Sequence, residues 1–154
     1  MMNNRAAANG ENVEKRLRTM RILWAVFLWN VFLFVLLVYV AADDERAESG
    51  AGPAPEGIPT LLAVLFAIGL ASVALSFVLK PRYFRQAVDE QKPEHVQTGL
   101  IVALVLCEVA ALLGVVAMFV IGHRYGYLLF ALAAVGQMLH YPRREQLLAA
   151  SYKT

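Results

Sequence analysis

Long apolar runs alternate with shorter polar segments along this chain. Four runs reach or approach the roughly 20 residues that a helix needs to cross the hydrocarbon core of a bilayer. They cover residues 22–42, 60–79, 98–121 and 125–141. The last run is the shortest, about 25 Å long at the helical rise of ~1.5 Å per residue. The pattern predicts an all-α, polytopic membrane protein with four transmembrane helices.

Polar segments flank and separate the four predicted spans. We expect a polar N-terminal segment over 1–20, an outer loop over 43–59, an inner loop over 80–97 and a tail over 143–154, around a transmembrane domain over 21–142. The outer loop is acidic at first and then rich in Gly, Ala and Pro. Such a composition makes a flexible linker rather than a domain.

Local composition gives further expectations. Residues 1–12 are polar with few apolar anchors, so we expect them to be disordered. Pro81 should end the second span, and residues 82–92 should form a separate helix along the membrane interface. The turn over 122–125 is so short that the third and fourth spans should form a tight antiparallel hairpin.

Basic residues gather at one end of the predicted bundle. Twelve of the 14 Lys and Arg lie before the first span, in the inner loop or in the tail, and only Arg46 and Arg124 lie opposite. Because positive residues in short flanking segments stay in the cytoplasm, both termini should be cytoplasmic, in a membrane of the bacterial inner-membrane type. One alternative is a cleaved signal peptide, since small residues precede Asp43. The first apolar run is, however, longer than the ~7–15 residues of a signal core.

Composition excludes several classes of protein. With 59% hydrophobic residues and a mean hydropathy of +0.55, the chain is too apolar for one soluble domain. His95 and His140 fall on the inner side and His123 on the outer, so they cannot share a metal, and we expect no metal or other cofactor. No catalytic motif is present, and no basic stretch is interleaved with exposed aromatics. We therefore expect neither enzymatic activity nor a nucleic-acid partner. The basic rim should attract anionic lipid headgroups.

A single carboxylate, Glu108, lies in the middle of the third apolar run. A charge at the bilayer centre costs about 2.5–3.5 kcal/mol, which the surrounding Leu, Ile, Val and Phe offset at ~0.3–0.6 kcal/mol each. No Lys or Arg lies inside a predicted span, so an ion pair within one chain is not expected. We expect a carboxyl group that keeps its proton and acts either as a hydrogen-bonding group or as a proton carrier.

Partners for this carboxyl can be chosen by their depth in the membrane. Asn30 falls at nearly the same level as Glu108, with Gly69 at that depth and Ser72 one turn nearer the cytoplasm. Our ion-binding hypothesis therefore comprises Glu108, Asn30 and Ser72. Gln137 should lie nearer the cytoplasm still. For Asn30 and Gln137, interhelical hydrogen bonding is the simpler interpretation.

Small residues let helices approach closely in lipid. They are frequent in the second, third and fourth runs, and we expect the packing positions to include Gly69, Ala111, Gly114 and Gly136. The first run is bulky and aromatic. Spans two to four should therefore pack tightly, with span one outside and facing lipid.

The run 106–117, in which Gly114 follows Glu108 in a series of Val, Ala and Leu, resembles the ion-binding helix of the rotor ring subunit c, or proteolipid, of rotary ATPases. The polar segment 91–94 is similar to the loop before that helix. The resemblance covers about residues 60–121 and implies that Glu108 matches the carboxylate that carries the proton or sodium ion. This chain differs in having one glycine in span two and a further span after the Glu-bearing helix.

Two hypotheses follow. The first is a small integral membrane protein that works by assembly, as a homo-oligomer or an accessory subunit of a membrane complex, with lipids and other membrane subunits as partners. The alternative is a proton- or ion-translocating component, like subunit c, that uses Glu108 as carrier.

Overall fold

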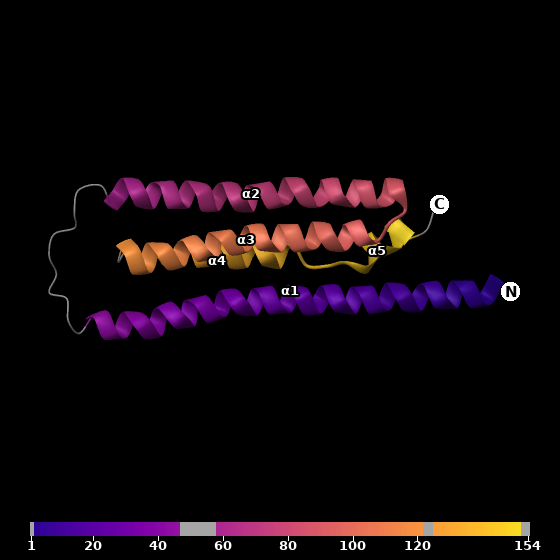
Figure 1. Cartoon of the computed structure of the whole chain (residues 1–154), viewed down its shortest axis with the longest axis horizontal. Helices are drawn as coiled ribbons and strands as arrows, with labels where there is room; N and C mark the ends of the chain where they lie inside the picture. The colour runs from indigo at the N-terminus through magenta and orange to yellow at the C-terminus, as the bar shows by residue number, and fades with distance from the viewer. Residues whose placement is uncertain (1, 47–57, 122–124, 152–154) are drawn as a thin grey trace.

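A computed structural model describes residues 2–46, 58–121 and 125–151. Throughout these ranges the regular structure is helical. The helices are α1 (Met2–Arg46), α2 (Ile58–Glu90), α3 (Glu94–Ile121), α4 (Gly126–Leu139) and α5 (Arg144–Ser151). The first four run antiparallel in sequence order, and α5 lies at the same end as the start of α1 (Figure 1). The outer loop predicted over 43–59 lies outside the described residues from 47 to 57.

Three helices are long and apolar enough to cross a membrane: Val13–Ala41 of α1, Thr60–Glu90 of α2 and Glu94–Phe119 of α3. The predicted all-helical fold is thus confirmed, with three candidate membrane spans among the described residues. In α4, by contrast, only 14 residues are helical. Four complete crossings and the cytoplasmic placement of the termini stay predictions.

Burial increases toward α3, which lies at the centre of the bundle between α1 and α2 (Figure 1). In the most apolar stretch of each helix, 50% of the residues are buried in α3, 22% in α2 and 11% in α1. Small residues explain the close contact of α2, α3 and α4. Ala103 and Ala110 of α3 and Ala133 of α4 are completely buried, and a Cβ on Gly69 of α2 would lie 3.6 Å from the Cβ of Ala110. Helix α1 is the most peripheral of the three long helices, as its bulky sequence predicts.

Two local predictions are wrong. Residues 2–12 belong to α1 instead of being disordered, because the three Ala, Arg5 and Glu11 favour helix and extend one that the long apolar part of α1 already nucleates. Pro81 does not end α2, which continues to Glu90, so residues 82–90 form no separate interfacial helix. A proline removes one backbone hydrogen bond, and packing beyond Pro81 compensates for that loss.

That packing is a small core at the polar end of the bundle. It brings together Leu17 and Met20 of α1, Ala87 of α2, Leu100 of α3 and Leu147 of α5, each at most 1% exposed. The predicted tail over 143–154 therefore contains a helix, α5, which covers this core. Ion pairs join its rim: Arg16 to Glu94 at 2.6 Å and Arg144 to Glu14 at 3.6 Å.

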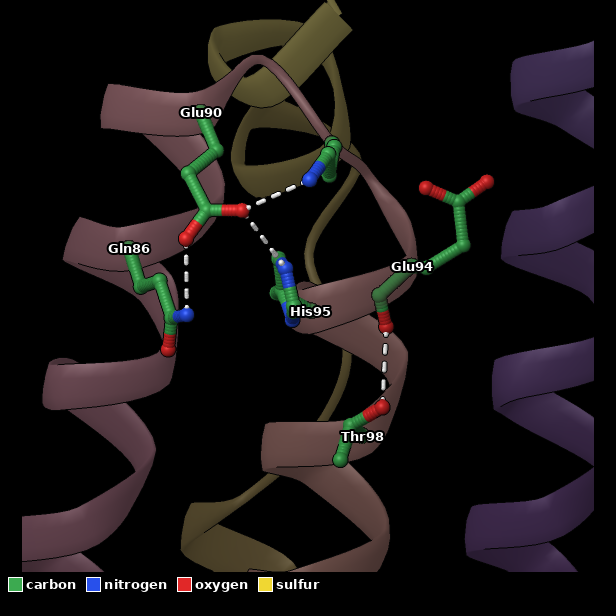
Figure 2. Close-up of polar contacts among 6 residues, drawn as sticks. Gln86, Glu90, Glu94, His95 and Thr98 are labelled. Carbon is green, nitrogen blue, oxygen red and sulfur yellow. Dashed lines mark hydrogen bonds and ion pairs between the residues drawn. The ribbon is translucent and has the colours of Figure 1, made fainter.

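The corner between α2 and α3 is closed by the carboxylate of Glu90 (Figure 2). Gln86 Nε2 donates to its Oε1 at 2.8 Å, Lys92 Nζ donates to Oε2 at 3.0 Å, and His95 Nε2 lies 3.2 Å from Oε2. Gln91 turns the chain with a φ of 54°. Glu90 is the last residue of α2, and these contacts with Gln86, Lys92 and His95 fix the start of the turn that leads into α3.

At the opposite end, α3 and α4 form the expected antiparallel hairpin. Residues 122–124 of the turn lie outside the described part. The two helices approach so closely that a Cβ on Gly114 would lie 3.1 Å from the carbonyl oxygen of Gly126. A Cβ on Gly126 would lie 2.7 Å from Cγ of Met118. Glycine at both positions therefore sets the helix separation.

Candidate functional site

The side chain of Glu108 projects from α3 toward α1 and α4, and the residue is 9% exposed. Asn30 Nδ2 of α1 donates a hydrogen bond to Glu108 Oε1. Gln137 Nε2 of α4 donates to Glu108 Oε2 at 2.9 Å. Each carboxyl oxygen therefore has a donor from a different helix, and one side chain links α1, α3 and α4.

The structure thus brings Asn30 to Glu108, while Ser72 does not take part. Ser72 lies half-buried on α2, and the hydrogen bonds of Glu108 come from α1 and α4. Gly69 also lies away from the carboxyl, where a Cβ would meet Leu129 Cδ2 at 2.8 Å. Its role is close contact of α2 with α3 and α4, not space beside Glu108.

Gln137 lies deeper than we predicted. Our depth argument counted helical residues back from the polar end, at ~1.5 Å each. However, α4 ends at Leu139, and residues 141–143 are not helical. Extended residues cover up to ~3.3–3.6 Å each. Three such residues separate Gln137 further from the polar end, which brings its amide to the level of Glu108.

Side chains from α1 and α2 cap the carbonyl end of α4. Trp24 Nε1 donates to the carbonyl oxygen of Gln137 at 2.7 Å, and Lys80 Nζ donates to that of His140 at 3.1 Å. The last carbonyls of a helix have no partner within it, so an end among apolar helices needs such donors. Gln137 is therefore fixed through its side chain by Glu108 and through its main chain by Trp24.

A second polar group lies next to this one, on the α2 side. Ser76 Oγ donates to the carbonyl of Val73 at 2.6 Å and lies 2.8 Å from His140 Nε2 and 3.7 Å from Cys107 Sγ. Ser76, Cys107 and His140 are at most 2% exposed. Sequence reasoning missed this group. The available signal was the spacing of Ser76 and Lys80, which places both on one face of α2.

One buried atom near Glu108 has no hydrogen-bond partner in the described part of the structure, Gln137 Oε1. An unpaired acceptor in an apolar interior is costly. A half-turn of the amide would exchange Nε2 and Oε1, and Oε1 would then accept a hydrogen bond from a protonated Glu108. The site can therefore hold the carboxyl in either protonation state, with two donors for the anion or with a donor and an acceptor for the acid.

All four predicted packing residues lie at helix contacts. Ala111 is completely buried. Gly69 and Gly114 face α4, where Cβ atoms would meet Leu129 side-chain atoms at 2.8 and 3.3 Å. A Cβ on Gly136 would lie 2.9 Å from Cys107 Sγ. The small-residue surfaces are therefore used for contacts within the chain.

Within the described residues no three His, Cys, Asp or Glu side chains gather so as to hold a metal ion. No protein-family model, no curated protein and no solved structure matches the chain.

Proposed function

We propose that this is a small integral membrane protein of the bacterial inner membrane that works by assembly, as a homo-oligomer or an accessory subunit of a membrane complex. The observation that carries the proposal is the position of Glu108. Its two oxygens accept hydrogen bonds from Asn30 and Gln137 of the same chain, and the residue is 9% exposed. A polar group enclosed in this way is suited to hold three helices in one arrangement.

The contact helix in this proposal is α1. Small-residue surfaces on α2, α3 and α4 are already used inside the chain, whereas α1 exposes a row of bulky apolar residues. Their spacings are four and three residues, which is the repeat by which helices pair side by side. The row consists of Ile22 (54% exposed), Val26 (58%), Trp29 (61%), Leu33 (43%), Leu36 (48%) and Val40 (58%).

Disulfide cross-linking in membranes tests this contact. In a Cys107→Ala background, Leu33→Cys places a thiol on the exposed row, and Val31→Cys places one at a position that is 3% exposed. We expect oxidation to cross-link the Leu33 variant into dimers, or to a co-purifying subunit, and to leave the Val31 variant monomeric. Absence of cross-linking at Leu33 and at its neighbours on the row would contradict an α1 contact.

The second candidate function is movement of protons or other ions. It is supported by the resemblance of the Glu108 helix to rotor subunit c and by the unpaired Gln137 Oε1, which allows the carboxyl to be held with or without its proton. In this alternative Glu108 would alternate between the two states.

Labelling with a hydrophobic carbodiimide distinguishes the two functions, because the reagent modifies protonated carboxyls in apolar surroundings. For an assembly protein we expect no modification of Glu108 in the folded protein and modification after unfolding in detergent. Rapid labelling of the folded protein that declines as the pH rises would instead favour the carrier. Mass spectrometry of peptides locates the label.

Glu108→Gln provides the matched variant, since it retains a polar side chain of similar size without a titrating proton. An assembly protein carrying this change should form the same complexes as the wild type. In sealed proteoliposomes, a proton carrier would lose its flux with the same substitution while it still assembled. Loss of flux with normal assembly would therefore refute assembly as the only role.

A further inference from the structure

An apolar groove of about 580 Å³ lies between α1 and α4. Its walls are aromatic and aliphatic, with Trp24, Trp29 and Phe32 from α1 and Tyr127, Phe130 and Met138 from α4. The volume falls within the ~300–1,000 Å³ that is usual for small-molecule sites. The groove lies on a different side of α1 from the exposed row, with Trp29 at the border of both.

The length of the groove matches one leaflet. On α1 it extends from Trp24 to Val35, and on α4 from Tyr127 to Met138. Eleven helical steps cover ~16 Å, close to half of the ~30 Å hydrocarbon core. One extended acyl chain from one leaflet would occupy this length.

At its polar end the groove adjoins a second surface pocket, of about 490 Å³, which is formed by α1 alone. Glu14, Lys15, Arg18, Arg21 and Ile22 line this pocket, and it shares Ala25 with the apolar groove. The negative charge of Glu14 faces Arg144 at 3.6 Å. Arg18 and Arg21 are both exposed, and neither has an ion pair with a described residue.

Arg21 is oriented over the entrance of the groove. Its guanidinium carbon lies 5.9 Å from the ring centre of Tyr141, and the ring of Tyr141 packs edge-on against Trp24 with centroids 5.1 Å apart. The aromatic pair thus holds a cation at the point where the apolar wall begins. Guanidinium groups bind phosphate through paired N–H donors.

We propose that this continuous surface is a binding site for an anionic phospholipid of the leaflet at the basic end of the bundle. One acyl chain lies in the groove between α1 and α4, and the phosphate lies against Arg18 and Arg21. Charge complementarity favours an anionic lipid over other occupants. An apolar helix would fill the groove but would leave Arg18 and Arg21 without an anion. In a zwitterionic lipid, the positive group of the headgroup would be repelled by the two arginines.

Quenching of tryptophan fluorescence by brominated lipids tests this proposal, since Trp24 and Trp29 are the only two tryptophans of the chain and both line the groove. Trp29→Phe removes the more exposed reporter and leaves Trp24 at the headgroup end. The full-length variant is placed in phosphatidylcholine bilayers that contain a minor fraction of brominated phosphatidylglycerol or, separately, brominated phosphatidylcholine. We expect several-fold stronger quenching by phosphatidylglycerol at equal mole fraction.

Two variants test the two halves of the site. Arg18→Gln with Arg21→Gln should weaken phosphatidylglycerol binding about 25-fold, at about five-fold per basic residue, and abolish the preference. Ala131→Leu, at an exposed groove position on α4, should abolish the preference by placing a branched side chain in the path of the acyl chain while the arginines remain. Arg82→Gln with Arg85→Gln is the matched control, because it removes the same charge from exposed positions on α2.

Each other outcome overturns the proposal. Equal quenching by the two lipids would show that no anion is selected. If the preference for phosphatidylglycerol survived Ala131→Leu, or if the α2 control lost it to the same extent, the lipid would be attracted to the basic surface in general and would not bind in the groove. Protection of Trp24 from both lipids would show that a protein segment occupies the groove.

Discussion

Replacement of Glu108 by leucine should destabilise the bundle, because it leaves two amide groups without their acceptor. Asn30 Nδ2 and Gln137 Nε2 both donate to the carboxyl, and Gln137 is completely buried. Interhelical hydrogen bonds in membranes contribute ~0.6 kcal/mol on average and up to ~1.7 kcal/mol. The loss of two such bonds predicts a decrease of about 1–3 kcal/mol in the free energy of unfolding for Glu108→Leu.

Two further variants separate the hydrogen bonds from other effects of the substitution. Glu108→Gln should cost less than about 0.6 kcal/mol, because its carbonyl oxygen still accepts from Asn30. After a half-turn of the Gln137 amide, the new amide at position 108 donates to Gln137 Oε1 in exchange for the lost bond from Nε2. Combining Glu108→Leu with Asn30→Leu and Gln137→Leu should restore much of the loss. The triple variant leaves no buried amide without a partner, whereas Glu108→Leu alone leaves the amides of Asn30 and Gln137 buried without an acceptor, at the full cost of their desolvation.

Reversible unfolding in mixed micelles, with increasing fractions of a denaturing detergent, provides the measurement. Trp24 is a suitable fluorescent reporter because its indole is bonded to the main chain of Gln137. The reasoning would be refuted if Glu108→Leu were as stable as Glu108→Gln, or if the triple variant were less stable than Glu108→Leu alone. Either result would mean that the carboxyl does not hold the three helices together.

Two other substitutions probe the packing and the helix end. Gly136→Ala should lower the free energy of unfolding by about 1 kcal/mol, since overpacking costs ~1–3 kcal/mol and the higher helix propensity of alanine offsets part of this cost. The new Cβ would lie 2.9 Å from Cys107 Sγ. Adding Cys107→Ala should therefore restore stability in the same micelle assay. Lys80→Met should lower the free energy of unfolding by about 1 kcal/mol and speed amide hydrogen exchange in the last turn of α4, because it removes the ammonium group that donates to the carbonyl oxygen of His140. Unchanged exchange in this turn would contradict the capping role of Lys80.

Sequence reasoning predicted those features that depend on long apolar patterns or on depth along one helix. Uninterrupted apolar runs identify the three long helices, and counting from the polar end pairs Asn30 with Glu108. The same counting failed for Gln137, because the position where α4 ends depends on donors from other helices. Trp24 and Lys80 supply those donors, and the local sequence of α4 does not predict them.

The polar end was predicted less well for a related reason. Residues 82–90 contain four charged residues and 144–151 begin with Arg144 and Glu145, and each segment alone suggests an exposed or interfacial element. Their apolar positions, such as Ala87 and Leu147, meet in one core only when α1, α2, α3 and α5 are assembled. Pro81 is tolerated within α2 because this tertiary packing continues the helix beyond it. Tertiary contact therefore overrides a signal that is reliable in isolated segments.

The early end of α4 has a consequence for the membrane around the protein. Fourteen helical residues measure ~21 Å, whereas a typical hydrocarbon core is ~30 Å thick. The opposite side of the bundle is formed by α2, whose candidate span has 31 residues. In the four-span arrangement that we predict, lipids beside α4 would have to thin to match its apolar length, whereas lipids beside α2 would not. With this mismatch on one side only, we expect the protein to be more stable in membranes with shorter acyl chains.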